Sequence, residues 1–158
     1  MKLIIFDVDG TLVCCKSGAT FRKTADDWQW LPGRIEKLQE LREQGVKFAI
    51  ASNQAGVAFP WSKFTEAEMQ AEIEAVARFI GAEYIGVCYS TPNEKALPRY
   101  CNANDTRRKP GPGMLLEAMK HYGISPEDTL MVGDREEDEK ASQAANVAFQ
   151  LASDFFGD

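Results

Sequence analysis

The chain has 158 residues, 44% of them hydrophobic and 27% charged, which is typical of a soluble globular protein and predicts one domain over residues 1–158. The formal net charge of −6 gives no overall basic surface for nucleic acid, although acids gathered around a metal ion would add to that count. No apolar run is long enough to span a membrane, the first residues do not resemble a signal peptide, and the four cysteines lack a disulfide spacing. We therefore expect a cytoplasmic protein.

Apolar runs alternate with amphipathic segments along the whole chain. The first run, at about 2–8, predicts a buried strand, and an irregular segment at 12–31, which we call the flap, follows it. The other expected elements are a helix at 32–45, a strand at 46–51, a helix at 65–80, a strand at 84–89, a helix at 113–122, a strand at 129–132, a helix at 135–145 and a strand at 147–150. Strands that alternate with helices predict an α/β fold with a parallel sheet of about five strands.

Polar residues follow several of the expected strands directly. Asp7 and Asp9 lie one residue apart at the end of the first strand, where like charges and burial both penalise ionisation unless a cation or a reaction requires them. Ser52 and Asn53 end the second strand, and Asp134 follows the fourth. Because ligands of parallel sheets bind beyond the carboxyl ends of the strands, we expect these groups to converge. Such a set indicates phosphoryl transfer through a carboxylate nucleophile, with Mg²⁺ between the acids and the phosphate.

Four motifs in this order resemble the haloacid dehalogenase (HAD) superfamily of aspartate-nucleophile phosphatases. They are Asp7-Val8-Asp9-Gly10-Thr11, Ser52-Asn53, Lys109, and Gly133-Asp134 with Asp138. Gln54 after the second motif and the run from Arg108 to Met114 resemble the branch that contains histidinol phosphatases, heptose bisphosphate phosphatases and polynucleotide 3′-phosphatases. The resemblance spans nearly the whole chain and implies a Rossmann-like, HAD-like sheet.

The resemblance also implies roles for the acids. Asp7 would attack phosphorus and carry an aspartyl-phosphate intermediate, and Asp9 would protonate the leaving alcohol and then activate water. Asp134, Asp7 and the backbone carbonyl of Asp9 would hold the Mg²⁺ cofactor. Asp138 would reach that ion through water or orient Lys109.

The remaining motif residues are expected to bind the phosphate. The Ser52 hydroxyl and the Asn53 backbone N–H would donate hydrogen bonds to it, and Lys109 would neutralise its charge. Arg108 would contact the phosphate or the body of the substrate with its planar guanidinium.

Some relatives in this branch hold a structural zinc ion through a Cys-x-His and a Cys-x-Cys pair. Here Cys88 lacks the histidine and Cys101 lacks the second cysteine. Two thiolates are too few for a closed tetrahedral site, so we expect no structural zinc.

The resemblance and the short connecting segments imply a minimal cap or none, and therefore an open site. The flap mixes basic and aromatic residues that suit a sugar-phosphate chain and its bases, unless the tryptophans pack the flap onto the body. These residues are Lys16, Phe21, Arg22, Lys23, Trp28 and Trp30. The same two possibilities, contact with a base or packing onto the body, apply to Phe59, Trp61 and Phe64.

Three functions are compatible with these residues. The first is a Mg²⁺-dependent phosphomonoesterase that acts on the 3′-phosphate end of a nucleic acid, which the open site and the flap slightly favour. The second is a phosphatase of a small metabolite, such as a sugar or amino-alcohol phosphate, which the acidic net charge favours. The third is a non-catalytic binding module, which would have lost one of the four motif residues Asp7, Asp9, Lys109 or Asp134, and none is lost.

Overall fold

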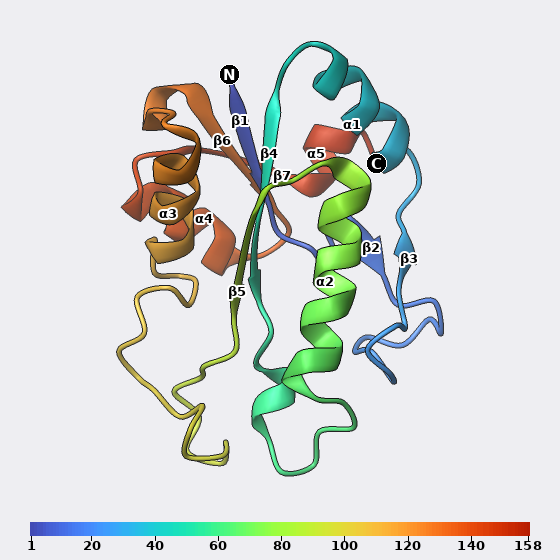
Figure 1. Ribbon diagram of the computed structural model, residues 1–158, viewed down its shortest axis with the longest axis vertical. Helices are drawn as coiled ribbons and strands as arrows, with labels where there is room; N and C mark the ends of the chain where they lie inside the picture. The colour runs from blue at the N-terminus through green and yellow to red at the C-terminus, as the bar shows by residue number, and fades with distance from the viewer.

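A computed structural model describes residues 1–158 and contains one five-stranded parallel sheet with the order β5-β4-β1-β6-β7. The strands are β1 (Leu3–Phe6), β4 (Lys47–Asn53), β5 (Tyr84–Cys88), β6 (Thr129–Gly133) and β7 (Ala148–Leu151). Figure 1 shows the sheet in the middle of the molecule, with β1 beside β4. The expected α/β fold with a parallel sheet of five strands is confirmed.

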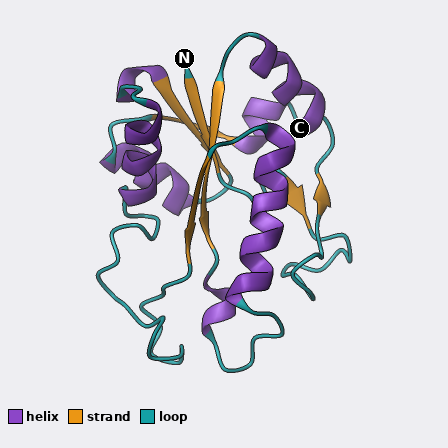
Figure 2. Ribbon diagram, viewed as in Figure 1, coloured by secondary structure: helices purple, strands orange, loops and turns teal.

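Helices cover both faces of the sheet (Figure 2). They are α1 (Arg34–Glu43), α2 (Glu66–Ile80), α3 (Gly113–Tyr122), α4 (Glu136–Ala144) and α5 (Ala152–Phe156), with short 3₁₀ turns at Ala55–Ala58 and Pro126–Asp128. Helices α3 and α4 lie on the left of the sheet in Figure 1, and α1, α2 and α5 lie on the right. None of these helices is both long and apolar enough to cross a membrane.

Strand β1 is the centre of the core because it is buried on both faces. Side chains alternate between the two faces of a strand, so Ile4 and Phe6 pack with α1, α2 and α5, whereas Leu3 and Ile5 pack with α3 and α4. All four are completely buried. Hydrogen-bonded pairing with β4 on one side and β6 on the other fixes the place where β1 ends.

The ends of α2 follow from local sequence. Thr65 accepts a hydrogen bond from the Glu68 backbone N–H, and the Glu68 carboxylate accepts one from the Thr65 N–H, which forms a capping box. Gly81 then ends the helix in the left-handed conformation, at φ 76°.

The flap is more ordered than its irregular sequence indicates. It forms an antiparallel pair of two-residue strands, β2 (Val13–Cys14) and β3 (Gln29–Trp30). The Trp28 indole N–H donates to the Glu72 carboxylate of α2 at 2.8 Å, and the Trp30 ring lies 5.2 Å from the Phe79 ring. The two flap tryptophans therefore pack the flap onto the body, which is the alternative to base stacking.

Candidate active site

The first motif turns sharply where β1 ends. The Asp7 N–H donates to the Val132 carbonyl at 3.1 Å, which keeps Asp7 next to β6. Gly10 has φ +82°, and a Cβ at this position would collide with the Asp134 carboxylate. Only glycine fits both the conformation and the space, so the turn brings the first and fourth motifs together.

Lys109 joins two acids from opposite ends of the chain. Its Nζ donates to Asp7 Oδ1 at 3.0 Å and to Asp138 Oδ1 at 2.6 Å, and its side chain is only 2% exposed. A buried ammonium between two carboxylates is compensated, whereas any one of these charges alone would be costly to bury. The structure thus assembles motifs one, three and four around one cation.

The two oxygens of Asp138 are both engaged. Oδ1 accepts from Lys109, and Oδ2 accepts the backbone N–H groups of Asp134 and Arg135 at 3.2 and 3.1 Å. Asp138 therefore contacts both Lys109 and the turn before α4, and that it orients Lys109 stays a prediction.

Asp7 and Asp134 are the better placed acids for a metal ion. Carboxylate oxygens of Asp7, Asp134 and Asp138 lie within 4.8 Å of one another, and Asp134 is exposed. Thr11 Oγ1 lies 3.3 Å from Asp7 Oδ2 and 3.5 Å from Asp134 Oδ1. Because Asp138 is 1% exposed and accepts three hydrogen bonds, Asp7 and Asp134 are the better candidates for metal ligands. Two carboxylates suit a hard divalent cation that keeps several waters.

Burial and charge shift the pKa values of the central pair. Burial raises the pKa of Asp7 well above its usual range; Lys109 opposes this shift, and the charges of Asp138 and Asp134 reinforce it. Burial alone would lower the pKa of Lys109, but Asp7 and Asp138 outweigh it and raise that pKa. A carboxylate crowded by like charges is one that a bound cation would keep ionised.

The second motif holds the loop that carries Lys109. The Asn53 side-chain amide donates to the Lys109 carbonyl at 2.9 Å and its oxygen accepts the Lys109 N–H at 3.1 Å. The Asn53 side chain thus has a positioning role that its motif did not predict. Ser52 is 1% exposed, and its hydroxyl accepts a hydrogen bond from the Gln54 amide at 2.8 Å.

The Asp9 carboxylate contacts the flap and the residue that follows β4. Arg22 of the flap donates to Asp9 Oδ1 through Nε at 3.0 Å and Nη2 at 2.8 Å, and Gln54 donates to Asp9 Oδ2 at 2.7 Å. Sequence reasoning did not predict either contact, since nothing in the pattern of a loop tells which of its basic residues will reach a particular acid.

One cavity of about 580 Å³ gathers most of the expected site residues. Its wall includes Asp7, Asp9, Asn53, Arg108, Lys109 and Asp134. Ser52 is buried next to this wall and contacts Gln54, which also lines the cavity.

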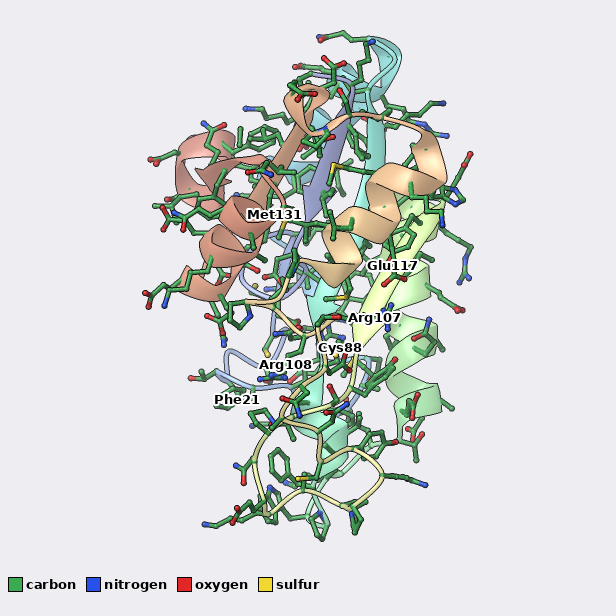
Figure 3. The ribbon with its side chains drawn as sticks, turned by 90° about the vertical axis from the view of Figure 1, so that its left-hand side faces the viewer. Phe21, Cys88, Arg107, Arg108, Glu117 and Met131 are labelled. Carbon is green, nitrogen blue, oxygen red and sulfur yellow. The ribbon has the colours of Figure 1, made fainter.

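The rim of this cavity is aromatic and basic. The exposed Phe21 and the partly buried Arg108 both line it, and both are labelled in Figure 3. Arg108 is held by a hydrogen bond of 2.8 Å to the Ser90 carbonyl. Arg107 instead pairs with Glu117 at 2.8 Å on the outside of the molecule (Figure 3). Of the two neighbouring arginines, only Arg108 lines the cavity.

The two cysteines considered for zinc lie near the loop after β5. Cys88 is buried, and its Sγ lies 3.4 Å from Asp105 Oδ2, while Cys101 is exposed. The absence of a structural zinc stays a prediction.

A family model described as polynucleotide kinase 3 phosphatase matches residues 2–156. The chain belongs to this family. D-glycero-beta-D-manno-heptose-1,7-bisphosphate 7-phosphatase of Pasteurella multocida is 33% identical over 149 residues, which are 92% of this chain and 78% of the relative. The enzyme of the same name from Pseudomonas putida is 33% identical over 150 residues, which are 93% of this chain and 79% of the relative.

Solved structures show the same fold. The D,D-heptose 1,7-bisphosphate phosphatase of B. bronchiseptica, solved with magnesium and phosphate, has a TM-score of 0.75 and 27% identity, over 96% of this chain and 80% of that one. A HAD-like phosphatase structure from Mesorhizobium loti has a TM-score of 0.76 at 22% identity, over 96% and 72% of the two chains.

These comparisons decide between the classes of function left open by the sequence. The chain is a HAD-superfamily phosphatase, that is, a phosphomonoester hydrolase, so the binding-module interpretation is wrong. The slight preference for a nucleic-acid end is not supported, because the curated relatives are named as phosphatases of a small sugar phosphate.

Proposed function

We propose that the protein is a Mg²⁺-dependent phosphatase of a small phosphorylated sugar. The observation that carries this proposal is the buried triad of Asp7, Lys109 and Asp138 beside the exposed Asp134, in the wall of one cavity. This set provides a nucleophile, a cation to neutralise the transferring phosphoryl group, and carboxylates that attract a metal ion.

The donor chemistry fits Mg²⁺. Asp7 and Asp134 offer hard oxygen ligands, and Asp138 supports them from the next helical turn. A bound Mg²⁺ ion would screen the acids from the phosphate and stabilise charge on its oxygens. Without a cation, three carboxylates against one lysine would repel a dianionic phosphate.

The reaction would proceed in two displacements. An Asp7 oxygen attacks phosphorus, the bond from phosphorus to the ester oxygen breaks, and Asp9 gives its proton to that oxygen. A water molecule then attacks phosphorus and gives a proton to Asp9, and the bond between phosphorus and the Asp7 oxygen breaks. Inorganic phosphate leaves, and Asp7 is again a carboxylate. Lys109 holds Asp7 at 3.0 Å and stabilises the transferring group in both steps.

The size of the cavity and the known relatives support a sugar phosphate. A volume of about 580 Å³ lies within the usual range for small-molecule sites. The Pasteurella and Pseudomonas relatives are named for a heptose bisphosphate. Trp28 and Trp30 pack against α2, so they do not offer their faces to a nucleic-acid base.

A nucleic-acid 3′-phosphate is the second candidate, because the matching family model is described by that activity and Phe21 stands exposed at the rim. The test is phosphate release with Mg²⁺ from heptose and hexose phosphates and bisphosphates, amino-alcohol phosphates and a 3′-phosphorylated oligonucleotide. We expect a sugar phosphate to give the highest kcat/KM. A clear preference for the oligonucleotide would replace the sugar phosphate with the second candidate.

Two variants serve as controls for this assay. Asp7→Asn removes the nucleophile and should abolish release from every substrate, whereas Asp154→Asn changes an exposed acid on α5 and should leave release unchanged. Equal activity of wild type and Asp7→Asn would contradict the phosphatase mechanism itself.

A further inference from the structure

We propose that Arg22, from the flap, is a positioning residue that fixes Asp9 for proton transfer to the leaving oxygen. This inference rests on the proposed phosphatase function and goes beyond it, because it assigns a flap residue to one step of the reaction. The step is protonation of the ester oxygen, which departs as an alcohol when Asp7 takes the phosphoryl group.

The contact between Arg22 and Asp9 has the form of a fixed support. Two guanidinium nitrogens donate to the same oxygen, Asp9 Oδ1, at 3.0 and 2.8 Å, and the third donates to the Ala25 carbonyl at 2.8 Å. All three nitrogens are therefore occupied within the protein. The Arg22 side chain is 4% exposed, whereas the Asp9 side chain is 41% exposed. Both residues line the cavity, and the acid is the more exposed of the two.

A second donor holds the other oxygen of Asp9. The Gln54 amide donates to Asp9 Oδ2 at 2.7 Å and to the Ser52 hydroxyl at 2.8 Å. Gln54 follows β4, while Arg22 comes from the flap, so two separate segments clamp one carboxylate. Groups that transfer protons must lie within hydrogen-bond reach of the reacting atom, and a clamped side chain loses less entropy in reaching it.

Hydrogen bonds on both sides of Arg22 hold the flap in place. Asp27 accepts the Ser17 N–H at 2.8 Å, the Ser17 hydroxyl at 2.7 Å and the Lys23 N–H at 3.0 Å. Trp28 ties the far end of the flap to Glu72 on α2. Arg22 lies between these ties, so its position is set by the folded flap.

The dependence of rate on leaving group separates this role from a structural one. An alkyl phosphate has a poor leaving group that needs a proton, whereas p-nitrophenyl phosphate has a good one that departs without help. The ratio kcat/KM reports the steps up to formation of the aspartyl-phosphate, so it isolates this proton transfer from later hydrolysis.

The experiment measures kcat/KM for the preferred sugar phosphate and for p-nitrophenyl phosphate, in wild type, Arg22→Gln and Arg22→Lys. General acid catalysis contributes about 10²–10⁴-fold, so we expect Arg22→Gln to lose at least roughly tenfold more on the sugar phosphate than on the aryl phosphate. Arg22→Lys keeps the positive charge but not the planar guanidinium. Its loss of kcat/KM on the sugar phosphate should lie between those of wild type and Arg22→Gln. Arg78→Gln, at an exposed position in the last turn of α2, is the matched control and should behave as wild type.

Some results would contradict the positioning role of Arg22, and one would contradict the proposed function. Equal losses on both substrates, or a gain on the sugar phosphate, would overturn the positioning role of Arg22. A rise in KM with kcat unchanged would also overturn it, because it would make Arg22 a substrate-binding residue. No hydrolysis of either substrate by the wild type would instead overturn the proposed function, and the inference with it.

Discussion

Asp138 shows how a buried residue can shape the site through the groups that it contacts. Its carboxylate receives one ammonium and two backbone N–H groups, and the residue is 1% exposed. Gly133 approaches it so closely that a Cβ there would collide with the Asp138 side chain. The fold therefore fixes this carboxylate from several directions, and through it fixes Lys109.

The variant Asp138→Asn tests this role. The amide oxygen can still accept the backbone N–H groups, but the amide nitrogen then faces Lys109 Nζ, two donors with no acceptor between them. Loss of such a supporting partner typically costs about 10–100-fold in activity, and we expect a fall in kcat of that size. The measurement is p-nitrophenyl phosphate hydrolysis, with circular dichroism to establish folding. An unchanged kcat in the folded variant would contradict the role assigned to Asp138.

At the level of elements, the flap owes its shape to Asp27. The Lys23 N–H contributes most to the low pKa of this carboxylate, followed by the Ser17 hydroxyl and the Ser17 N–H, and together they lower the pKa to about 2 from 3.8. A group with a lowered pKa in the folded state stabilises that state above its unfolded pKa. The Asp27 contribution is therefore complete above about pH 4 and is lost as the pH falls towards 2.

This pH dependence can be followed by NMR. We expect the Asp27 carboxyl carbon to titrate with a midpoint near pH 2, and the Ser17 and Lys23 amide signals to shift over the same range. In Asp27→Asn the two amides should exchange with solvent faster at pH 5, while amides of α3 stay as in wild type. A midpoint near pH 4 for Asp27 would show that its hydrogen bonds do not hold the flap.

Local sequence predicts the longer elements of this fold but not the shortest ones. The strands and the four longer helices were predictable because their apolar runs and end signals are local, as in the Thr65–Glu68 capping box. The paired strands of the flap have two residues each and α5 has five, too few for any period to register. These short elements are held by tertiary contacts, which local sequence does not encode.

The motif residues of the site could likewise be predicted from the sequence, but some of their contacts could not. Asp7, Asp9, Lys109 and Asp134 were predictable because each occupies a recognisable motif next to a strand or loop. The partners of Asp9 were not, because Arg22 and Gln54 meet it across 13 and 45 residues of chain. Such contacts depend on how the flap packs, and that is known only once the fold is in place.

For the whole molecule, we expect stability to depend on a cation that the acids of the site bind. A metal ion that binds only the folded chain stabilises it by about 2.7 kcal/mol at one hundred times its Kd. For a chain of this length that corresponds to a rise in Tm of roughly 5–10 °C.

Calorimetry with and without Mg²⁺, at matched ionic strength, tests this expectation. Wild type and Asp154→Asn should both show the rise in Tm, and a chelator should reverse it. Asp134→Asn should lose most of it, because this variant removes one of the two free ligands. An equal rise in Asp134→Asn would place the cation elsewhere on the molecule.

The central place of β1 also has a consequence for synthesis on the ribosome. The pairing partner of this strand, β6, is translated on the order of 120 residues after it, a delay of roughly ten seconds at usual elongation rates. Until then the edge of β1 that pairs with β6 stays open, and the nascent chain lacks Asp134 and Asp138. The proposed nucleophile Asp7 is therefore synthesised long before the rest of the site. We expect activity to begin only after α4 has emerged from the ribosome.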